Sequence, residues 1–414
     1  MVFCMHSMFN VLNNLSYIYK NHVIEHGSCI LKKLNMKTSV LFLGFGLLLC
    51  SSCKLISVIN NESVTTKAGS IKVENVNLPI VRINIATAKE KAFLFDTGAS
   101  LSFINSDSIL DENTVRKAFA FGTIKTPDGG KTKNKLLPVH IETPWFESDN
   151  KVVGFFPISN GKCNYRMPFD GVVGLDVFIN SDLILELNSQ ESVITSHKTE
   201  NFDKNQLLGF EKIDVVFEKK SIKIPLTING ETNNYLLDTG NSSTLILPYS
   251  SHLDSLSNKK IIIEGKSLSS LKGKFGEEAI MFYDAKIGLG NQIFKAPVLT
   301  QKEGKIWNMG MEAIKQFNWF INFSTQEVYI KRNLLLPQEI VLKKMYYSSI
   351  EGDKIVVMTK VKGSNRYKLG DEIISVNNEK VTPENICKVQ KLLNETNDWE
   401  TLKIEVKPQA KPQS

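Results

Sequence analysis

Short hydrophobic runs broken by Gly, Asn, Asp and Pro follow one another from residue 70 to residue 335. Residues 81–85 alternate apolar and polar side chains, which is the pattern of a strand with one buried face. Residues 92–95 and 261–263 are apolar throughout, as in strands that are buried on both faces. Runs this short, separated by turn residues, predict strands rather than helices. We therefore expect an all-β architecture, a sandwich or a barrel, over this part of the chain.

The pattern changes after Pro337, where the last part of the chain combines strands with one helix. The predicted strands lie within residues 354–361, 368–377 and 401–406. Thr382 and Pro383 predict the start of the helix, because Thr is a good N-cap and Pro suits the first helical position. Residues 338–408 are thus expected to form a separate, small α+β domain.

The first 53 residues have the pattern of a leader. Met36-Lys37 precedes an apolar run over residues 40–50, and two Ser and Cys53 follow. A basic start, a short apolar core and small residues at its end are typical of a secretory signal peptide, here residues 36–53. The run is too short to be a good membrane-spanning helix. We interpret Met36 as the initiator and residues 1–35 as a mis-assigned extension.

The end of this leader resembles the lipobox of bacterial lipoproteins, which implies lipid attachment at Cys53 and a location in the cell envelope or periplasm. A plain signal peptide with an incidental Cys is the alternative. Residues 54–69 are polar and rich in Ser, Thr and Asn, so they predict a tether.

Composition changes this picture little. The chain has 414 residues, of which 42% are hydrophobic and 22% charged, as in ordinary globular proteins. The formal charge of +7 falls to +4 without the leader, which holds four Lys and one Glu, and no basic run remains. We therefore expect no nucleic-acid partner. The six Cys match no zinc-site spacing, so composition indicates no zinc site, and we expect packed cores rather than disulfides as the source of stability.

A duplication organises the β-rich region. The sequence FLFDTGAS at residues 93–100 returns as YLLDTGNS at residues 235–242. Residues 174–194 and 310–330 also correspond, each starting with Gly and ending in an apolar strand. We predict two homologous lobes, residues 70–200 and 206–335, joined by a polar linker.

Each repeat contains the triplet Asp-Thr-Gly directly after an apolar strand. Asp at the end of a buried strand projects its carboxylate from the loop, and Gly permits a sharp turn. Two such loops that meet bring Asp96 and Asp238 together. Carboxylates this close cannot both ionise easily, so they share one proton. One can then activate a water as general base while the other polarises a carbonyl group.

These motifs resemble the aspartic peptidases of the retropepsin and pepsin type, here with both lobes in one chain. The resemblance covers about residues 70–335 and implies a bilobed double β-barrel that cleaves proteins or peptides without a cofactor. It implies that Asp96 and Asp238 are the catalytic pair. Further residues that the resemblance assigns to the support of the catalytic loops are Thr97, Gly98, Thr239, Gly240, Gly174 and Gly310. Gly174 follows two apolar residues, as in the family, whereas Asn308 replaces an apolar residue before Gly310.

The residue after each triplet departs from pepsins. Pepsin-like enzymes have Ser or Thr there, with a hydroxyl that stabilises the charged carboxylate, whereas this chain has Ala99 and Asn241. Our hypothesis is that the pair titrates higher than in pepsins, with activity nearer pH 5–7 than pH 2. A kcat/KM profile with its maximum below pH 3 would contradict it.

Turn residues follow each catalytic loop at a similar distance. The segment 125–131 contains Asp128, Gly129 and Gly130 and predicts a hairpin 32 residues after Asp96. Residues 272–276 hold a similar signal in the second repeat. The resemblance implies that such a hairpin is a flap over the substrate. An ordinary surface hairpin is the alternative.

The string LGDEIISVN at residues 369–377 resembles the core of a PDZ domain, a module that binds peptides by strand addition. Residues 350–353 replace its glycine-rich carboxylate-binding loop, so a packing role for this PDZ-like domain is the alternative. We expect a monomeric, exported aspartic endopeptidase. The competing hypothesis is a non-catalytic peptide-binding or scaffold protein of the envelope.

Overall fold

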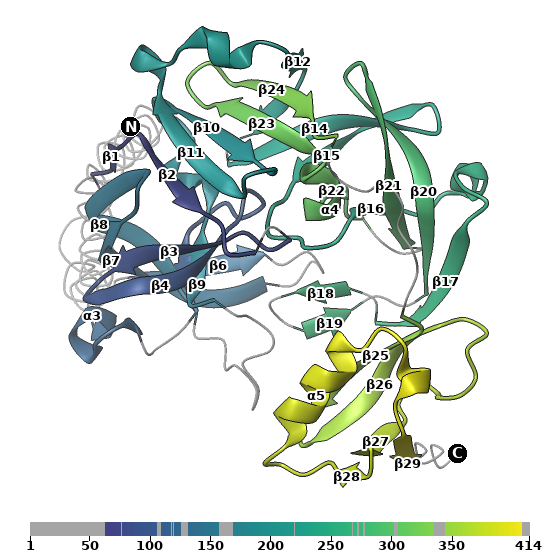
Figure 1. The fold of residues 1–414 in the computed structure, drawn as a ribbon. Coiled ribbons are helices and arrows are strands. Elements are labelled where there is room, and N and C mark those ends of the chain that lie inside the picture. The colour runs from purple at the N-terminus through teal and green to yellow at the C-terminus, as the bar shows by residue number, and fades with distance from the viewer. Residues whose placement is uncertain are drawn as a thin grey trace, which may run out of the picture. The chain divides into compact units, whose positions relative to one another are not determined.

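The computed structural model divides the chain into two compact units, Met1–Asn60 and Asn61–Ser414, and all described residues belong to the second. The described residues are 63–75, 77–105, 109–116, 118, 120–125, 131–156, 169–218, 220–266, 268–270, 273–275, 278–301, 305–334 and 344–407. They are mostly β-structure. The expectation of an all-β protein is therefore confirmed at this coarse level (Figure 1).

Six strands of the first repeat close into a barrel, because β8 pairs with both β5 and β7. In ring order they are β3 (Ile80–Ile85), β4 (Ala88–Phe95), β9 (Gly171–Val173), β5 (Phe103–Ile104), β8 (Phe146–Phe155) and β7 (Lys131–Glu142). The apolar run at the end of β4 is buried, as its sequence predicts. We call this ring the first barrel. The short α3 (Glu112–Arg116) lies between β5 and β6 (Ala120–Lys125) in the chain.

The second repeat forms an equivalent ring, which the pairing of β14 with β20 closes. Its strands, in the matching order, are β14 (Ser221–Ile228), β15 (Glu231–Leu237), β22 (Asn308–Met309), β16 (Leu245–Pro248), β21 (Gln292–Gln301) and β20 (Ala279–Leu289). We call it the second barrel. Each strand corresponds to one of the first barrel, so the duplication read from the sequence recurs in the pairing order.

A six-stranded sheet joins the two barrels, with strands of both repeats at its centre (Figure 1). Its order is β12 (Glu211–Ile213), β24 (Glu327–Arg332), β23 (Phe317–Asn322), β10 (Leu183–Asn188), β11 (Val193–Lys198) and β2 (Gly69–Lys72). In the antiparallel β10–β23 pair, Leu185 lies opposite Ile321, its own counterpart in the other repeat. The repeats are therefore related by an approximate twofold axis through this pair.

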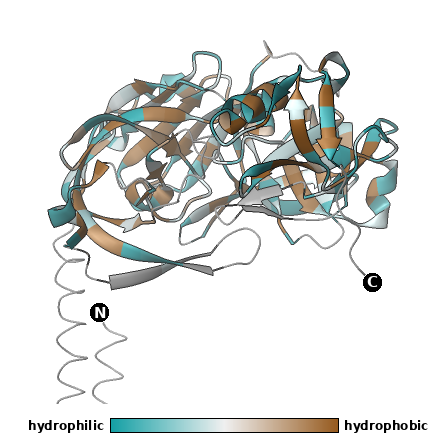
Figure 2. Ribbon diagram, turned by 90° about the horizontal axis from the view of Figure 1, so that it is seen from below, coloured by the Kyte–Doolittle hydropathy of each residue, from teal (hydrophilic) through white to brown (hydrophobic). Residues whose placement is uncertain are grey.

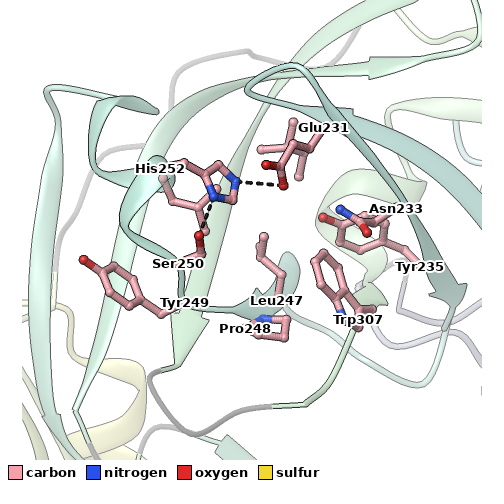
Figure 3. A pocket seen from close by; sticks show the side chains of 11 residues that line it. Glu231, Asn233, Tyr235, Leu247, Pro248, Tyr249, Ser250, His252 and Trp307 are labelled. Atoms are coloured by element: carbon pink, nitrogen blue, oxygen red, sulfur yellow. Dashed lines mark hydrogen bonds and ion pairs between the residues drawn. The ribbon is translucent and has the colours of Figure 1, made fainter.

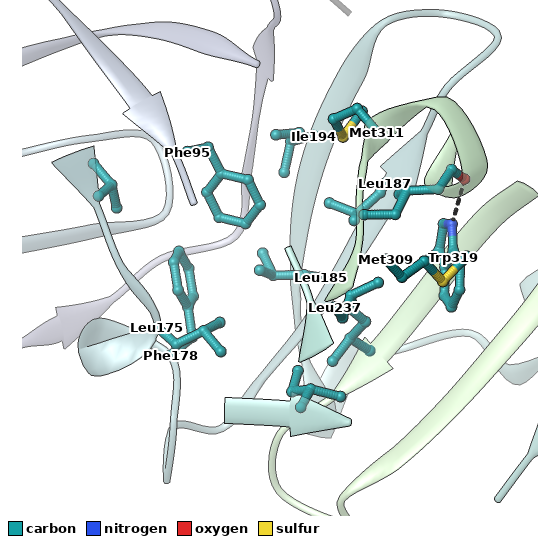
Figure 4. Close-up of a cluster of buried hydrophobic side chains, with 14 of the residues drawn as sticks. Phe95, Leu175, Phe178, Leu185, Leu187, Ile194, Leu237, Met309, Met311 and Trp319 are labelled. Atoms are coloured by element: carbon teal, nitrogen blue, oxygen red, sulfur yellow. Dashed lines mark hydrogen bonds between the residues drawn. The ribbon is translucent and has the colours of Figure 1, made fainter. Parts of the chain in front are cut away.

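One hydrophobic core runs through both barrels and under the joining sheet. Figure 4 shows its middle, where Leu185 and Leu237 lie between Phe95 on one side and Met309 on the other. The ring of Phe95 packs edge-on against Phe178, with centroids 5.9 Å apart. Because Phe95 and Leu237 directly precede the two Asp residues of the triplets, this packing holds both catalytic-loop candidates on one rigid base. Figure 2 shows the hydrophobic and hydrophilic stretches that alternate along the strands.

The C-terminal module, residues 344–407, has its own core. It consists of β25 (Tyr346–Glu351), β26 (Lys354–Val361), β27 (Glu372–Val376), β28 (Glu379–Lys380), α5 (Ile386–Glu395) and β29 (Ile404–Lys407). The helix begins at Ile386 with Asn385 as its cap, so the N-cap predicted at Thr382 is wrong. Cys387 is disulfide-bonded, so the expectation that disulfides play no part in stability is also wrong.

This module is joined to the second barrel by backbone pairing. Strand β17 (Lys260–Gly265), which also pairs with β20, continues the sheet onto β26. Gly265 has a φ of +94°, and a Cβ there would lie 2.1 Å from the carbonyl oxygen of Met358. Lys360 and Glu264 add an ion pair of 3.1 Å across the junction. The module predicted as separate thus shares a continuous sheet with the barrel.

Residues 63–69, the end of the predicted tether, contain β-structure. Within it, β1 (Thr65–Thr66) pairs with β8, and β2 begins at Gly69, so the last residues of this segment are structured. The predicted signal peptide and lipidation site, residues 36–53 with Cys53, lie outside the described residues. Among the helices that are described, none has the length and apolarity needed to cross a membrane.

The remaining short elements connect these parts. They are β13 (Val216–Glu218), β18 (Leu268–Ser270), β19 (Gly273–Phe275), α4 (Met311–Ile314) and the 3₁₀ turns η2 (Leu175–Val177), η3 (Thr199–Asn201), η4 (Lys204–Leu207), η5 (Ser251–Ser255) and η6 (Trp399–Thr401).

Candidate active site

The structure brings the two predicted Asp residues into direct contact. Asp96 follows β4 and Asp238 follows β15, the equivalent strands of the two barrels. Their side chains interact directly, since each is among the causes that shift the pKa of the other. Two carboxyl groups in such contact can hydrogen-bond only when one of them is protonated. The contact is the one that a pair sharing one proton needs.

Two Thr residues lock the loops together across the twofold axis. The hydroxyl of Thr97 donates to the carbonyl of Leu237 at 2.7 Å and accepts from the backbone N–H of Thr239 at 3.1 Å. The hydroxyl of Thr239 makes the symmetry-related pair of bonds. It donates to the carbonyl of Phe95 at 2.7 Å and accepts from the N–H of Thr97 at 3.0 Å. Both Thr side chains are buried, so each hydrogen bond has no competing water. The predicted supporting positions Thr97 and Thr239 thus connect the two loops.

Each Gly of the triplets lies against the carboxyl group of the opposite loop. A Cβ on Gly98 would lie 2.6 Å from Cγ of Asp238, and a Cβ on Gly240 would lie 2.4 Å from Cγ of Asp96. Real Cβ atoms do not approach so closely, so no larger residue fits either position without separating the pair. The N–H of Gly98 also donates to Oδ1 of Asp96 at 2.7 Å.

Gly174 and Gly310, the other predicted supporting residues, occupy equivalent positions one strand away. Each precedes a short helical element, with φ and ψ of −93° and −178° at Gly174 and −90° and 178° at Gly310. The residue after Gly174 donates its N–H to the carbonyl of Ala99, and the residue after Gly310 donates to that of Asn241. These contacts hold the backbone just beyond each triplet.

The electrostatics of the pair follow from its burial. Burial, and then the carboxylate of Asp238, raise the pKa of Asp96 well above the usual value of an aspartate. Burial also raises the pKa of Asp238, but hydrogen bonds from Asn308, Asp96 and backbone N–H groups oppose that rise. The side-chain donor of Asn308 is thus what distinguishes the surroundings of Asp238 from those of Asp96.

Replacing Asp96 with Asn should increase the free energy of unfolding more at pH 8 than at pH 4. The folded protein favours neutral Asp96, so the wild type has its full stability below the unfolded pKa of about 4 and loses stability as the pH rises through the folded pKa. Above the folded pKa, the wild type has lost about 1.4 kcal/mol of stability for each unit by which folding raises the pKa of Asp96. Urea unfolding at both pH values measures the difference, with the exposed Asp214→Asn as control. The prediction is contradicted if Asp96→Asn changes the free energy of unfolding by the same amount at both pH values.

The surroundings of the two Asp residues are not equivalent, in a way that the motifs did not predict. Neither Ala99 nor Asn241 provides a side-chain donor to its carboxylate. The side-chain amide of Asn308 instead donates to Oδ2 of Asp238, and Asn241 donates to Oδ1 of Asn308 at 2.7 Å. One signal was visible in the sequence, since both Asn residues depart from the family pattern in the same repeat.

The predicted flap residues Asp128, Gly129 and Gly130 lie outside the described residues. The strands on either side of them, β6 and β7, pair in antiparallel register from Ala120 opposite Leu136 to Lys125 opposite Lys131. In the second repeat the turn predicted at residues 272–276 is misplaced, because residues 273–275 form strand β19, which pairs with β18. Both segments thus have the strands of a hairpin.

A second group of polar side chains lies in a pocket of the second barrel, shown in Figure 3. His252 contacts the hydroxyl of Ser250 through Nδ1 and the carboxylate of Glu231 through Nε2 at 3.2 Å. Ser, His and an acid are the residues of a hydrolase triad, but the acid of that triad is buried. The Glu231 side chain is 57% exposed, so this group lacks a defining property of such a site.

The described residues hold no group of three or more His, Cys, Asp or Glu that could bind a metal. His140 and His197 pair with Asp149 and Glu186, in keeping with surface or structural roles. Asp176, close to Gly174 in sequence, forms a buried ion pair with Lys151 at 2.8 Å.

No protein-family model matches the chain, and no curated protein matches it significantly.

Proposed function

We propose that this protein is an aspartic endopeptidase whose catalytic pair is Asp96 and Asp238. The observation that carries the proposal is the close approach of two buried carboxyl groups at the ends of equivalent strands, each against the Gly of the opposite triplet. Buried carboxyl pairs that share a proton supply an acid and a base at once, which is what hydrolysis of an unactivated amide requires. The interlocked Thr97 and Thr239 support it further, because they hold both groups in place before substrate binds.

The reaction needs no group beyond the pair and one water. The carboxylate takes a proton from the water as its oxygen attacks the scissile carbonyl carbon. The neutral acid gives its proton to the carbonyl oxygen, which forms a tetrahedral diol. The carbon–nitrogen bond then breaks as the newly protonated carboxyl group gives its proton to the nitrogen, while a hydroxyl of the diol returns its proton to the other carboxylate. The products are a carboxylic acid and an amine. The pair ends with one proton, as it began.

We further propose that the enzyme is exported and anchored in the cell envelope by a lipid on Cys53. This rests on the leader sequence alone. Its substrates are then proteins or peptides of that compartment, and the enzyme acts as a monomer with a pepsin-like or retropepsin-like bilobed architecture. The closed six-stranded rings of both repeats support this finer assignment.

The competing role is peptide binding by the C-terminal module, which we propose to be PDZ-like. Strand addition would use the edge of β25 that faces α5. Gln390 of α5 donates its side-chain amide to the carbonyl of Ser348 in β25 at 3.0 Å, and the Ser348 hydroxyl donates to the Gln390 side chain at 3.3 Å. Because both groups are buried, an added peptide would have to displace them. A packing role for the module is therefore favoured.

The test of the proposed function is cleavage of a denatured protein by residues 54–414 between pH 3 and pH 8. We expect cleavage that a pepstatin-like inhibitor blocks, because its hydroxyl mimics the tetrahedral intermediate at the pair. A metal chelator should leave the rate unchanged. If cleavage is absent over the whole range and the inhibitor does not bind, the protein has a binding role instead.

A further inference from the structure

The two members of the pair receive different sets of hydrogen bonds. Asp96 accepts from the N–H groups of Gly98 and Ala99 at 2.7 and 3.1 Å. Asp238 accepts the equivalent bonds from the N–H groups of Gly240 and Asn241, the latter at 3.1 Å. In addition, Asp238 accepts a bond from the side-chain amide of Asn308, through its other oxygen. The second loop therefore gives its carboxylate one more donor.

The direction of this extra hydrogen bond is set by a backbone group. The N–H of Ser243, which can only donate, contacts Oδ1 of Asn241 at 2.9 Å. This leaves the NH₂ of Asn241 to donate to Oδ1 of Asn308 at 2.7 Å. The NH₂ of Asn308 must then point to Oδ2 of Asp238. We call Ser243, Asn241 and Asn308 the amide chain.

The first barrel has no such chain. The residue equivalent to Asn308 is Val172, since both precede the apolar residue and Gly that support the triplet loop. The residue equivalent to Asn241 is Ala99. Neither side chain carries a donor, so Asp96 is left with backbone N–H groups from its own loop. Asn308 is buried, so its donor acts on Asp238 without screening by water.

We propose that the amide chain decides which member of the pair carries the negative charge, with Asp238 as the carboxylate that deprotonates water and Asp96 as the acid that protonates the substrate carbonyl. The assignment of catalytic roles rests on the proposed function. A hydrogen bond to an ionised carboxylate stabilises the charged form more than the neutral form. Asn308 and Asn241 are thus positioning residues for a proton, and the duplicated site is chemically asymmetric.

The first test is the pH profile of kcat/KM for Asn308→Val, which restores the residue type of the first barrel. Loss of the donor destabilises charged Asp238, so the acidic limb should move up by about one to two pH units. The basic limb should move less, because both states that it connects contain the same charged Asp238. Unchanged limbs in a variant with wild-type unfolding behaviour would overturn the proposal.

Asn241→Ala tests whether Asn241 acts on Asp238 by orienting Asn308 or has only a general structural role. It keeps the donor but frees Asn308 to rotate, so the acidic limb should shift in the same direction by a smaller amount. In the Asn308→Val background, Asn241→Ala should cause no further shift, because its effect passes through Asn308. Additive shifts would show that the two residues act independently and would overturn the proposed chain.

A titration that needs no activity keeps this inference separate from the proposed function. Carbon-13 NMR of protein labelled at the aspartate carboxyl carbon follows both groups, which Asp96→Asn and Asp238→Asn assign. We expect Asp238 to ionise first in the wild type and at higher pH in Asn308→Val. If Asp96 ionises first, the inference fails even where the enzyme cleaves protein. If Asp238 ionises first in a protein without peptidase activity, the asymmetry stands and the peptidase assignment fails.

Discussion

Asp96→Asn and Asp238→Asn are each expected to lower kcat/KM on a denatured protein by about 10²–10⁴-fold or more, the usual contribution of a general acid or base. Asn has nearly the same shape as Asp but cannot accept a proton from water or donate one from a carboxyl group. Because the proposed mechanism uses both groups at once and they contact each other, loss of either leaves no complete acid–base pair. We therefore expect both variants to be affected to a similar extent, and the double variant to lose little more.

The control for this experiment uses the Ser–His–Glu group in the pocket of the second barrel. Ser250→Ala and His252→Ala alter the pocket of Figure 3 without touching the pair. Both should retain the wild-type rate. Peptidase activity that survives either Asp change would exclude the mechanism, and loss of activity in Ser250→Ala would point to a serine hydrolase site instead. Unfolding curves of all variants verify that they are folded.

The centre of the candidate site could be predicted from the sequence because a repeated motif predicts two equivalent loops related by a twofold axis. Two identical triplets at equivalent strand ends meet only if the repeats face each other across a twofold axis. The β10–β23 pair provides that relation, with Leu185 opposite Ile321. The apolar run before Asp96 likewise predicted its own burial correctly.

The amide chain could not be predicted in the same way. Asn241 and Asn308 are far apart in the chain, and they meet because short β22 pairs in parallel with β15. A family pattern predicts an apolar residue at position 308, so Asn there reads as a weaker match rather than as a functional group. Two polar exceptions in one repeat were visible, but their contact depends on the fold.

The junction of the C-terminal module with the second barrel was also missed. Pairing of β17 with β26 uses backbone groups of exposed strand edges, which impose no pattern on the side chains. The helix start in this module was misplaced for a local reason. The side chain of Asn385 accepts the N–H of Thr382 at 2.8 Å, so a turn precedes α5 and the helix begins later.

Thr97→Val and Thr239→Val are each expected to lower the free energy of unfolding by about 2–4 kcal/mol. Val has almost the shape of Thr, so packing is kept, but two hydrogen bonds are lost at each site. Thr97→Val leaves the carbonyl of Leu237 and the N–H of Thr239 without these partners in a buried region. Each buried group left unpaired costs about 1–3 kcal/mol. Urea unfolding at pH 7 measures the loss.

The same changes should reduce kcat/KM well beyond what the loss of stability explains, because the two Thr residues join the loops that hold Asp96 and Asp238. Thr195→Val is the matched control, since its hydroxyl contacts Ser70 at an exposed position. That variant should stay within about 0.5 kcal/mol of the wild type and keep its activity. If Thr97→Val is as stable as the control, the interlocked hydrogen bonds do not hold the loops together. If it is destabilised but fully active, the pair must be positioned by the barrels alone, and the close approach of Gly98 and Gly240 to the opposite carboxyl groups would then be sufficient.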